Sequence, residues 1–470
     1  MKRLLLLGSL VLLAASPAKL TERQRAQHAL NRLAFGARPG DVDRVMQIGV
    51  DAWIEQQLHP ERIDDAAVDA RLREYSTLQY SDAEMVGEFY KPILELRKDK
   101  ENKEANEEVM KELRQKGRKV GAELVSQRIL RAADSERQLN EVLVDFWMNH
   151  FNVYAAKGVD RFLLTSYERD VIRPNIWGHF DDLVLATAKS PAMLVYLDNA
   201  RSRRGAINEN YARELMELHT LGVDGGYTQK DVTELARVLT GWSLKRPQGD
   251  DVSFIFRPNL HDKDPKQLLG VTVAANGGID EGERMIGFLA HQPATAHHIA
   301  KKLCQRLVSD DPPPALIDRV AKRFLATNGD LRETVRAIIT SREFWSPNAY
   351  RAKFKSPFEY AISAVRAVGG EVVNPLPLSR ELQKIGEPLY QAAPPTGYSD
   401  LSDAWTNSGA LMARLNFAVA LTAGKLPGVR VEHVPPLDVD LSANTRKAIA
   451  DKDPITTAGL ILGSPEFQRQ

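Results

Sequence analysis

The most informative stretch of this sequence extends from Asn208 to Gly222 and reads Asn-Glu-Asn-Tyr-Ala-Arg-Glu-Leu-Met-Glu-Leu-His-Thr-Leu-Gly. Its apolar residues recur at helical spacing, and the turn Asp224-Gly-Gly-Tyr227 follows it. The pattern predicts a helix that ends at Gly222 and a second helix that begins at Thr228 or Asp231. A helix with many Glu, Arg, Asn and His residues beside a strictly apolar face indicates that these polar side chains form a specific site.

Four polar residues of this helix share one face. A spacing of 3.6 residues per turn places on one stripe Asn210, Arg213, Glu214 and Glu217. His219 lies on the neighbouring apolar arc, because an offset of five residues turns it about 140° away from Glu214. One regular helix therefore cannot use these two side chains to chelate a metal ion. His219 alone is typical of a core histidine bonded to the backbone. For Glu214 we keep open a functional role and an internal ion-pair network with Arg213.

Two further polar pairs carry chemistry. Asn149 and His150 lie near the end of a predicted helix, and His150 could point into a cleft shared with Glu214. His261-Asp262 lies in a loop between predicted strands, where side chains are free for acid–base or metal chemistry. The candidate catalytic residues are Glu214, His150, His261 and Asp262. The supporting polar network consists of Asn149, Asn210, Arg213, Glu217 and His219.

The chain has the composition of a globular protein. Its 470 residues are 43% hydrophobic and 27% charged, and the formal net charge is +1. A nucleic-acid-binding surface needs a clustered basic excess, which is missing, so we expect no nucleic-acid partner. Cys304 is the single cysteine, which excludes an intrachain disulfide.

Helical periodicity dominates and predicts a mainly α fold, a large multi-helix single domain over residues 19–470. Residues 91–131 are heavily charged and predict a solvated arm of long exposed helices. Residues 243–280 predict a loop and β-hairpin insertion, in which segments 252–256 and 267–273 pair as strands. Residues 386–403, rich in Pro, Gly and Tyr, predict an irregular loop.

The N-terminus has the pattern of an export signal. Lys2-Arg3 is a positive region, residues 4–15 are apolar, and Ser16-Pro17-Ala18 offers small residues for cleavage. The apolar run is shorter than the ~20 residues that span a bilayer. We therefore expect a signal peptide over residues 1–18, export to the periplasm or the extracellular space, and no membrane span after its removal.

Several enzyme classes lack their motifs in this sequence. It contains no Gly-x-Ser-x-Gly elbow, Walker loop, Rossmann fingerprint or His-Glu-x-x-His. Serine hydrolases of the elbow type, P-loop NTPases, typical dinucleotide enzymes and zincins are therefore disfavoured.

A set of short motifs along nearly the whole mature chain carries a family resemblance. They are His28–Gly36, Trp53–Leu58, Phe146–Phe151, Ala192–Leu194, Asn208–Gly226, Leu235–Trp242, His261-Asp262 with Lys266 and Gly270, Ala296–Ala300, Pro394–Gly397 and Ser408–Leu411. With them the chain resembles a bacterial exported family of unknown function, domain of unknown function 1800. The resemblance implies one large, mainly helical, exported protein. It also implies a neighbouring gene for an exported sulfatase-like protein, a candidate partner. It brings no agreed catalytic residue.

Two interpretations of the function follow. The first is an exported hydrolase-like enzyme that uses carboxylate and histidine acid–base chemistry or a divalent metal, with Glu214 as general base or ligand. The second is a non-enzymatic exported scaffold or binding partner of the sulfatase-like protein. In that case the polar stripe fixes helix register, and the basic loop Arg201–Arg204 or the charged arm contacts the partner.

Overall fold

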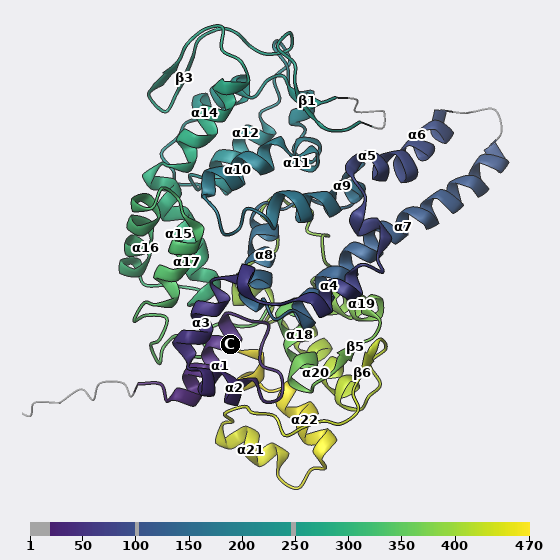
Figure 1. Cartoon of the computed structure of the whole chain (residues 1–470), viewed down its shortest axis with the longest axis vertical. Helices are drawn as coiled ribbons and strands as arrows, with labels where there is room; N and C mark the ends of the chain where they lie inside the picture. Colours follow the sequence, from purple (N-terminus) through teal and green to yellow (C-terminus); the bar gives the residue numbers. More distant parts are fainter. Residues whose placement is uncertain (1–18, 99–102, 246–250) are drawn as a thin grey trace, which may run out of the picture.

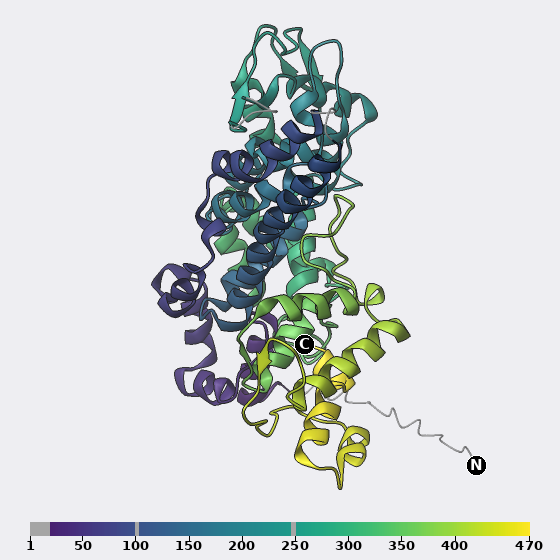
Figure 2. The same ribbon diagram turned by 90° about the vertical axis from the view of Figure 1, so that its right-hand side faces the viewer.

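The computed structural model describes residues 19–98, 103–245 and 251–470, and it is mainly helical (Figure 1). The molecule is elongated, with strand β3 (Lys266–Leu268) near one end and helix α22 (Pro454–Leu462) near the other (Figure 1, Figure 2). The predicted signal peptide lies outside the described residues and stays a prediction. None of the helices described is long and apolar enough to cross a membrane.

The N-terminal part consists of short helices joined by tight turns. Their bounds are α1 (Glu22–Arg32), α2 (Asp41–Ile48), α3 (Val50–Gln57), η1 (Pro60–Arg62), α4 (Ala66–Leu72), η2 (Ser76–Gln79), α5 (Asp82–Met85) and the π-helical turn η3 (Val86–Tyr90). Thr21 caps α1 through reciprocal hydrogen bonds with Gln24. Gly49, with φ of 93°, separates α2 from α3 by a conformation that only glycine adopts readily.

The charged arm consists of α6 (Lys91–Lys98) and α7 (Lys103–Asp134), an antiparallel pair that projects from the body (Figure 1). Lys111 and Glu112 are exposed, as a solvated arm requires. The prediction is wrong for the C-terminal part of α7, where Leu124 and Ile129 are buried. That part of α7 packs against α18 (Pro357–Ala367) and α19 (Pro375–Ile385) and enters the core.

The middle of the chain supplies the helices that surround the predicted polar positions. They are α8 (Gln138–His150), α9 (Asp160–Ser166), η4 (Tyr167–Ile172), α10 (Phe180–Lys189), α11 (Pro191–Tyr196), η5 (Asn199–Arg201), α12 (Asn210–Glu214), η6 (Leu215–His219) and α13 (Gln229–Val238). The helix predicted from Asn208 begins regularly but continues as the π-helical turn η6, so a single regular helix was wrong. The predicted restart is confirmed, because Thr228 and Asp231 form a capping box at the start of α13.

The insertion at residues 243–280 contains two small antiparallel sheets. Strand β1 (Trp242–Leu244) pairs with β2 (Phe254–Phe256), and β3 pairs with β4 (Val271–Val273). The predicted pairing of segments 252–256 and 267–273 with each other is therefore wrong. Leu269 and Gly270, both at positive φ, close β3 onto β4 in a two-residue turn, so each strand finds a partner nearby in the sequence.

The C-terminal half is again helical, apart from one short sheet. Its remaining elements are α14 (Ile279–Ala290), α15 (Pro293–Leu307), α16 (Pro314–Ala326), α17 (Leu331–Ile339), β5 (Glu371–Val372), η7 (Ser402–Ala404), α20 (Ser408–Thr422), β6 (Val429–Arg430), α21 (Ala443–Ile449) and α23 (Pro465–Gln468). Between α19 and η7 the chain has no regular element, which confirms the irregular loop predicted there.

Two apolar cores meet along α7 and α8. On α7, Leu124 belongs to the first core and Ile129 to the second. On α8, Leu143 belongs to the first and Val142 to the second. The polar side chains between these residues are consequently buried at the junction of the cores. The prediction of a single domain over residues 19–470 stays a prediction.

Candidate functional site

The loop 388–403 lies across the C-terminal end of α8 and is fixed there by two asparagines. Asn149 accepts a hydrogen bond from the Tyr398 N–H at 2.7 Å and donates one to the Tyr398 carbonyl at 2.8 Å. Asn152 donates to the carbonyl oxygens of Ala392 and Pro394, each at 2.9 Å. These bonds bring together the motifs Phe146–Phe151 and Pro394–Gly397, which are far apart in the sequence.

Gly397 explains why the loop approaches α8 so closely. Its φ is 68°, and a Cβ added there would lie 2.3 Å from Asn149 Oδ1. A side chain at this position would therefore both strain the backbone and push the loop away from Asn149.

A pocket of about 60 Å³ lies between α8, the loop 388–403 and the segment before α18. Its charged lining residues are Arg128, Asp145, Arg306, Lys353, Glu359, Glu387 and Asp400. Such a concentration of ionisable groups at the junction of two apolar cores is costly unless each charge is paired.

Most carboxylates that line this pocket have a cationic partner. Arg306 contacts Asp145 at 3.1 Å and Glu359 at 2.7 Å. Arg128 makes a second contact with Asp145 at 2.7 Å. Lys302 pairs with Asp400 at 2.7 Å, and Lys353 bonds the Asp400 carbonyl oxygen at 2.6 Å. For three of the four carboxyl groups, an ion pair therefore offsets the cost of burying the charge.

Glu387 is the fourth carboxyl group and has no ion pair within the described part of the chain. The residue is 8% exposed, and its Oε2 accepts a hydrogen bond from the Phe358 N–H at 2.9 Å. Burial raises the pKa of Glu387 to about 7, and the nearby Asp145 carboxylate adds to the shift. Both protonation states are thus populated near neutral pH, as a general acid or base requires.

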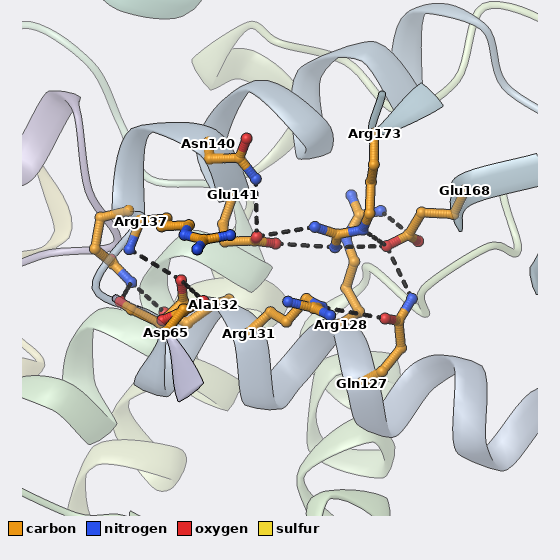
Figure 3. A network of polar contacts seen from close by, with 12 residues as sticks. Asp65, Gln127, Arg128, Arg131, Ala132, Arg137, Asn140, Glu141, Glu168 and Arg173 are labelled. Carbon is orange, nitrogen blue, oxygen red and sulfur yellow. Dashed lines mark hydrogen bonds and ion pairs between the residues drawn. The ribbon is translucent and has the colours of Figure 1, made fainter. Parts of the chain in front are cut away.

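A second ionic network adjoins the pocket through Arg128 and Tyr390. Figure 3 shows Arg173 between two carboxylates: it contacts Glu141 at 2.8 Å and Glu168 at 2.7 Å. Gln127 donates to Glu168 at 2.9 Å, and the Tyr390 hydroxyl donates to it at 2.5 Å. Burial opposes the ionisation of Glu168, but Arg173 and Arg128 outweigh it and lower its pKa to about 2. This network is ionised and fully bonded, which is typical of a structural element.

His150 and His219 lie together in the core. His219 is buried as predicted, but neither of its ring nitrogens has a hydrogen-bond partner among the described residues, so the predicted bond to the backbone is not found. The two ring centroids are 6.1 Å apart, and His150 Nε2 lies 3.2 Å from the His219 carbonyl oxygen. His298 of α15 completes the group at 6.2 Å from His150. Burial lowers the pKa of His219 to about 3 and the pKa of His150 well below its ordinary value. These rings are therefore uncharged at neutral pH.

The predicted polar stripe does not form one network. Arg213 pairs with Glu209 at 3.3 Å and donates to Gln229, so an ion-pair network of Arg213 with Glu214 is not found. Asn210 is exposed. Glu214 and Glu217 have intermediate exposure, and burial, together with the Glu217 carboxylate, raises the pKa of Glu214.

His261 and Asp262 have separate partners. His261 Nδ1 lies 2.8 Å from the Thr240 carbonyl oxygen, and its Nε2 lies 3.6 Å from Glu281, which pairs with buried Lys266 at 2.5 Å. Asp262 forms a two-pronged contact with Arg237 at 2.9 and 3.2 Å. Burial raises the pKa of Asp262, but the Arg237 hydrogen bond outweighs this and lowers it. Both residues tie the insertion to α13 and α14.

The candidate residues fall into three groups by their contacts, and a cleft shared by these groups stays a prediction. Across the described ranges, no hydrogen bond or ion pair connects the His150–His219 pair, Glu214 and the His261–Asp262 pair. The described part of the chain contains no group of three His, Cys, Asp or Glu side chains placed to hold a metal ion.

One family model matches this chain, over residues 28–469, and is described as a protein of unknown function, DUF1800. The match extends over far more than half of the sequence. The chain belongs to this family. No curated protein and no solved structure matches it. Within the matched residues, Phe146, Met148 and Asn149 line the pocket beneath the loop.

Sequence reasoning missed the charged residues of that pocket. Asp145, which pairs with Arg128 and Arg306, was not among the predicted site residues. Glu387 gave one signal, because it is a carboxylate inside a loop rich in Pro, Gly and Tyr that also contains the motif Pro394–Gly397. Lys353 and Glu359 gave another, since both flank the apolar start of α18.

Proposed function

We propose that the protein is a hydrolase-like acid–base enzyme in which Glu387 transfers the proton. The observation that carries the proposal is the pairing pattern of the pocket. Asp145, Glu359 and Asp400 each have a cationic partner, and Glu387 has none within the described residues. Burial, and then Asp145, raises the pKa of Glu387 to about 7. A carboxyl group with these properties in a pocket is a functional-site candidate.

The other residues of the pocket supply fixed charge and shape. Arg306 holds the carboxylates of Asp145 and Glu359 in place. The electrostatic field that these charges exert on Glu387 therefore stays the same when Glu387 gains or loses its proton. In its neutral form Glu387 donates a proton to a leaving group, and in its charged form it accepts one from water. The volume of about 60 Å³ holds roughly two water molecules. A larger substrate therefore needs the loop 388–403 to move.

A panel of chromogenic aryl esters, glycosides and phosphates tests this proposal on the full chain between pH 6 and 8. We expect one substrate class to be hydrolysed, and Glu387→Gln to lower the rate by about 100-fold or more with unchanged circular dichroism. Glu432→Gln is the matched control, because the Glu432 side chain is 86% exposed. Hydrolysis that survives in Glu387→Gln, or an inactive wild-type protein over the whole panel, contradicts the proposal.

Glu214 is a second candidate for proton transfer. It has no hydrogen bond or ion pair to any of the described residues, and burial followed by the Glu217 carboxylate raises its pKa. The metal-assisted form of the hypothesis rests on this residue and on His150 and His261. Metal analysis of chelator-free protein tests that form: near-stoichiometric metal that is lost in Glu214→Gln or His261→Ala supports it, and metal-free active protein contradicts it.

The non-enzymatic alternative concerns a different surface. Arg201, Arg203 and Arg204 are exposed, and the Arg201 side chain is 86% exposed. If the protein is a non-enzymatic binding partner, we propose that this basic loop contacts the exported sulfatase-like protein. Stoichiometric co-purification that survives Glu387→Gln but not reversal of these charges supports it. Export itself, expected from residues 1–18, is tested by N-terminal sequencing of the periplasmic protein.

A further inference from the structure

A second pocket, of about 240 Å³, lies between α1, α18 and the C-terminal segment. Its volume corresponds to roughly eight water molecules, enough for a small organic molecule. Lys355 and Phe467 line it, whereas Lys353, two residues earlier in the chain, lines the pocket of Glu387. The two sites therefore lie on different sides of one segment.

Lys355 is buried beside an aromatic ring. The residue is 2% exposed, and its Nζ lies 4.0 Å from the centroid of the Phe467 ring. The backbone N–H of Lys355 donates to the Gln468 carbonyl at 2.9 Å, and Arg414 donates to the backbone carbonyl oxygen of Lys355 at 2.9 Å. Within the part of the chain that the structure describes, the amine has no carboxylate partner. The buried Lys355 amine therefore faces the pocket and not a carboxylate group.

The surroundings favour the uncharged form of this amine. Burial lowers the pKa of Lys355 to about 7; Glu359 opposes the shift, and the guanidinium groups of Arg351 and Arg414 add to it. A desolvated lysine beside other cations is the environment that makes an amine nucleophilic at neutral pH.

The rim of the pocket carries cations that no carboxylate neutralises. Arg351 bonds the backbone carbonyl of Asp440, and Arg469 is exposed and has no ion pair with any described residue. The acids of the lining already have partners: Asp43 and Asp438 pair with Arg23, which also lines the pocket, and Glu466 bonds Ser442 and Thr445. The pocket thus offers a nucleophile at its base and free positive charge at its rim.

We propose that this pocket is a second ligand site, in which the Lys355 amine forms an imine with the carbonyl carbon of a small anionic aldehyde or keto acid. The amine nitrogen attacks the carbonyl carbon, and the resulting carbinolamine loses its oxygen as water. One C=N bond replaces one C=O bond, and the two amine protons leave with that water. Arg351 and Arg469 bind the carboxylate of the ligand.

Reductive trapping on the full-length protein tests this assignment. Glyoxylate is the anionic probe, sodium cyanoborohydride reduces the imine, and peptide mass mapping gives the labelling rate of each lysine. At pH 7 about half of a lysine population with a pKa near 7 is uncharged, against under ~0.1% for an ordinary lysine. We expect Lys355 to be labelled at least ~10-fold faster than exposed Lys425, with a rate midpoint near pH 7.

Matched controls separate the site from general lysine chemistry. Lys353 is equally buried but paired with Asp310, so it should stay unlabelled. Arg469→Gln should slow labelling by glyoxylate and leave labelling by neutral propionaldehyde unchanged, because Arg469 lines the pocket but is not among the cations that lower the pKa of Lys355. Glu387→Gln should leave the Lys355 rate unchanged, which separates this site from the proposed acid–base function. Lys355 labelling no faster than that of Lys425 overturns the proposal, and equal labelling by both probes overturns the anionic ligand class.

Discussion

Asn149 holds Tyr398 by both of its amide atoms: Oδ1 accepts from the Tyr398 N–H at 2.7 Å, and Nδ2 donates to the Tyr398 carbonyl at 2.8 Å. This pair of bonds attaches the loop 388–403 to the end of α8. The loop in turn carries Tyr398, Ser399 and Asp400 into the wall of the pocket that contains Glu387. Asn149 therefore acts on the pocket through the loop and not as a catalytic residue.

Asn149→Ala should release the loop. It leaves the N–H and the carbonyl of Tyr398 without partners, at a cost of about 2–4 kcal/mol in the free energy of unfolding. Hydrogen–deuterium exchange should rise in residues 388–403 before it rises in α8. Asn210→Ala, at an exposed position of α12, should change stability by under ~0.5 kcal/mol. Equal exchange in the loop of Asn149→Ala and wild type would show that other contacts hold it.

Glu168→Gln should destabilise the junction of the two cores. It removes the charge that Arg173 and Arg128 require, at a cost of about 3–5 kcal/mol at pH 7. The pKa of Glu168 is lowered from 4.5 to about 2, so its ionic contribution is complete above about pH 4.5 and is lost as pH falls through about 2. The difference between wild type and variant in urea unfolding should consequently shrink on acidification. A constant difference from pH 7 to pH 3 would contradict the assignment.

His261→Ala should destabilise the fold, whereas Glu214→Gln should not. His261 is 1% exposed and bonded to Thr240, so its loss should cost about 2–4 kcal/mol. Glu214 has no partner among the described residues, and Gln resembles its protonated form, so thermal stability should change little. Differential scanning calorimetry of both variants is the check. A His261→Ala protein as stable as wild type would return His261 to the list of functional candidates.

The sequence predicted those elements that depend on local chemistry. The restart of a helix at Thr228 follows from its capping box with Asp231, and the end of the preceding segment follows from Gly222, whose φ of 83° glycine adopts readily. The π-helical turn at Leu215–His219 has no such local signal. Strand pairing in the insertion also failed, because β-propensity identifies strands without identifying partners.

The candidate site was predictable only in outline. The motifs Phe146–Phe151 and Pro394–Gly397 were both noted, but nothing in their spacing shows that one loop crosses the other helix. The charges of the pocket come from α7, α8, α15, α18 and the loop after α19, and only folding brings them together. His150 and His219 were predicted as site residues because of the chemistry of histidine. Burial in an apolar core, however, keeps both rings uncharged.

Glu387→Gln should change the pH dependence of stability. With a pKa raised from 4.5 to about 7, Glu387 keeps its proton in the folded state and loses it in the unfolded state. Wild-type stability therefore falls as pH rises from about 4.5 to about 7, by roughly 3 kcal/mol. Urea unfolding at pH 5 and pH 8 should show this component in wild type and not in Glu387→Gln. Parallel pH profiles for the two proteins would contradict it.

The most direct measurement of the central claim is the titration of Glu387 itself, by infrared difference spectroscopy of wild type against Glu387→Gln. If Glu387 transfers the proton, wild type should show a protonated-carboxyl band that is missing from the variant and disappears with a midpoint near pH 7. A carboxyl group that is already ionised at pH 6, with a midpoint near 4.5, would contradict the assignment of Glu387 as the proton-transferring group.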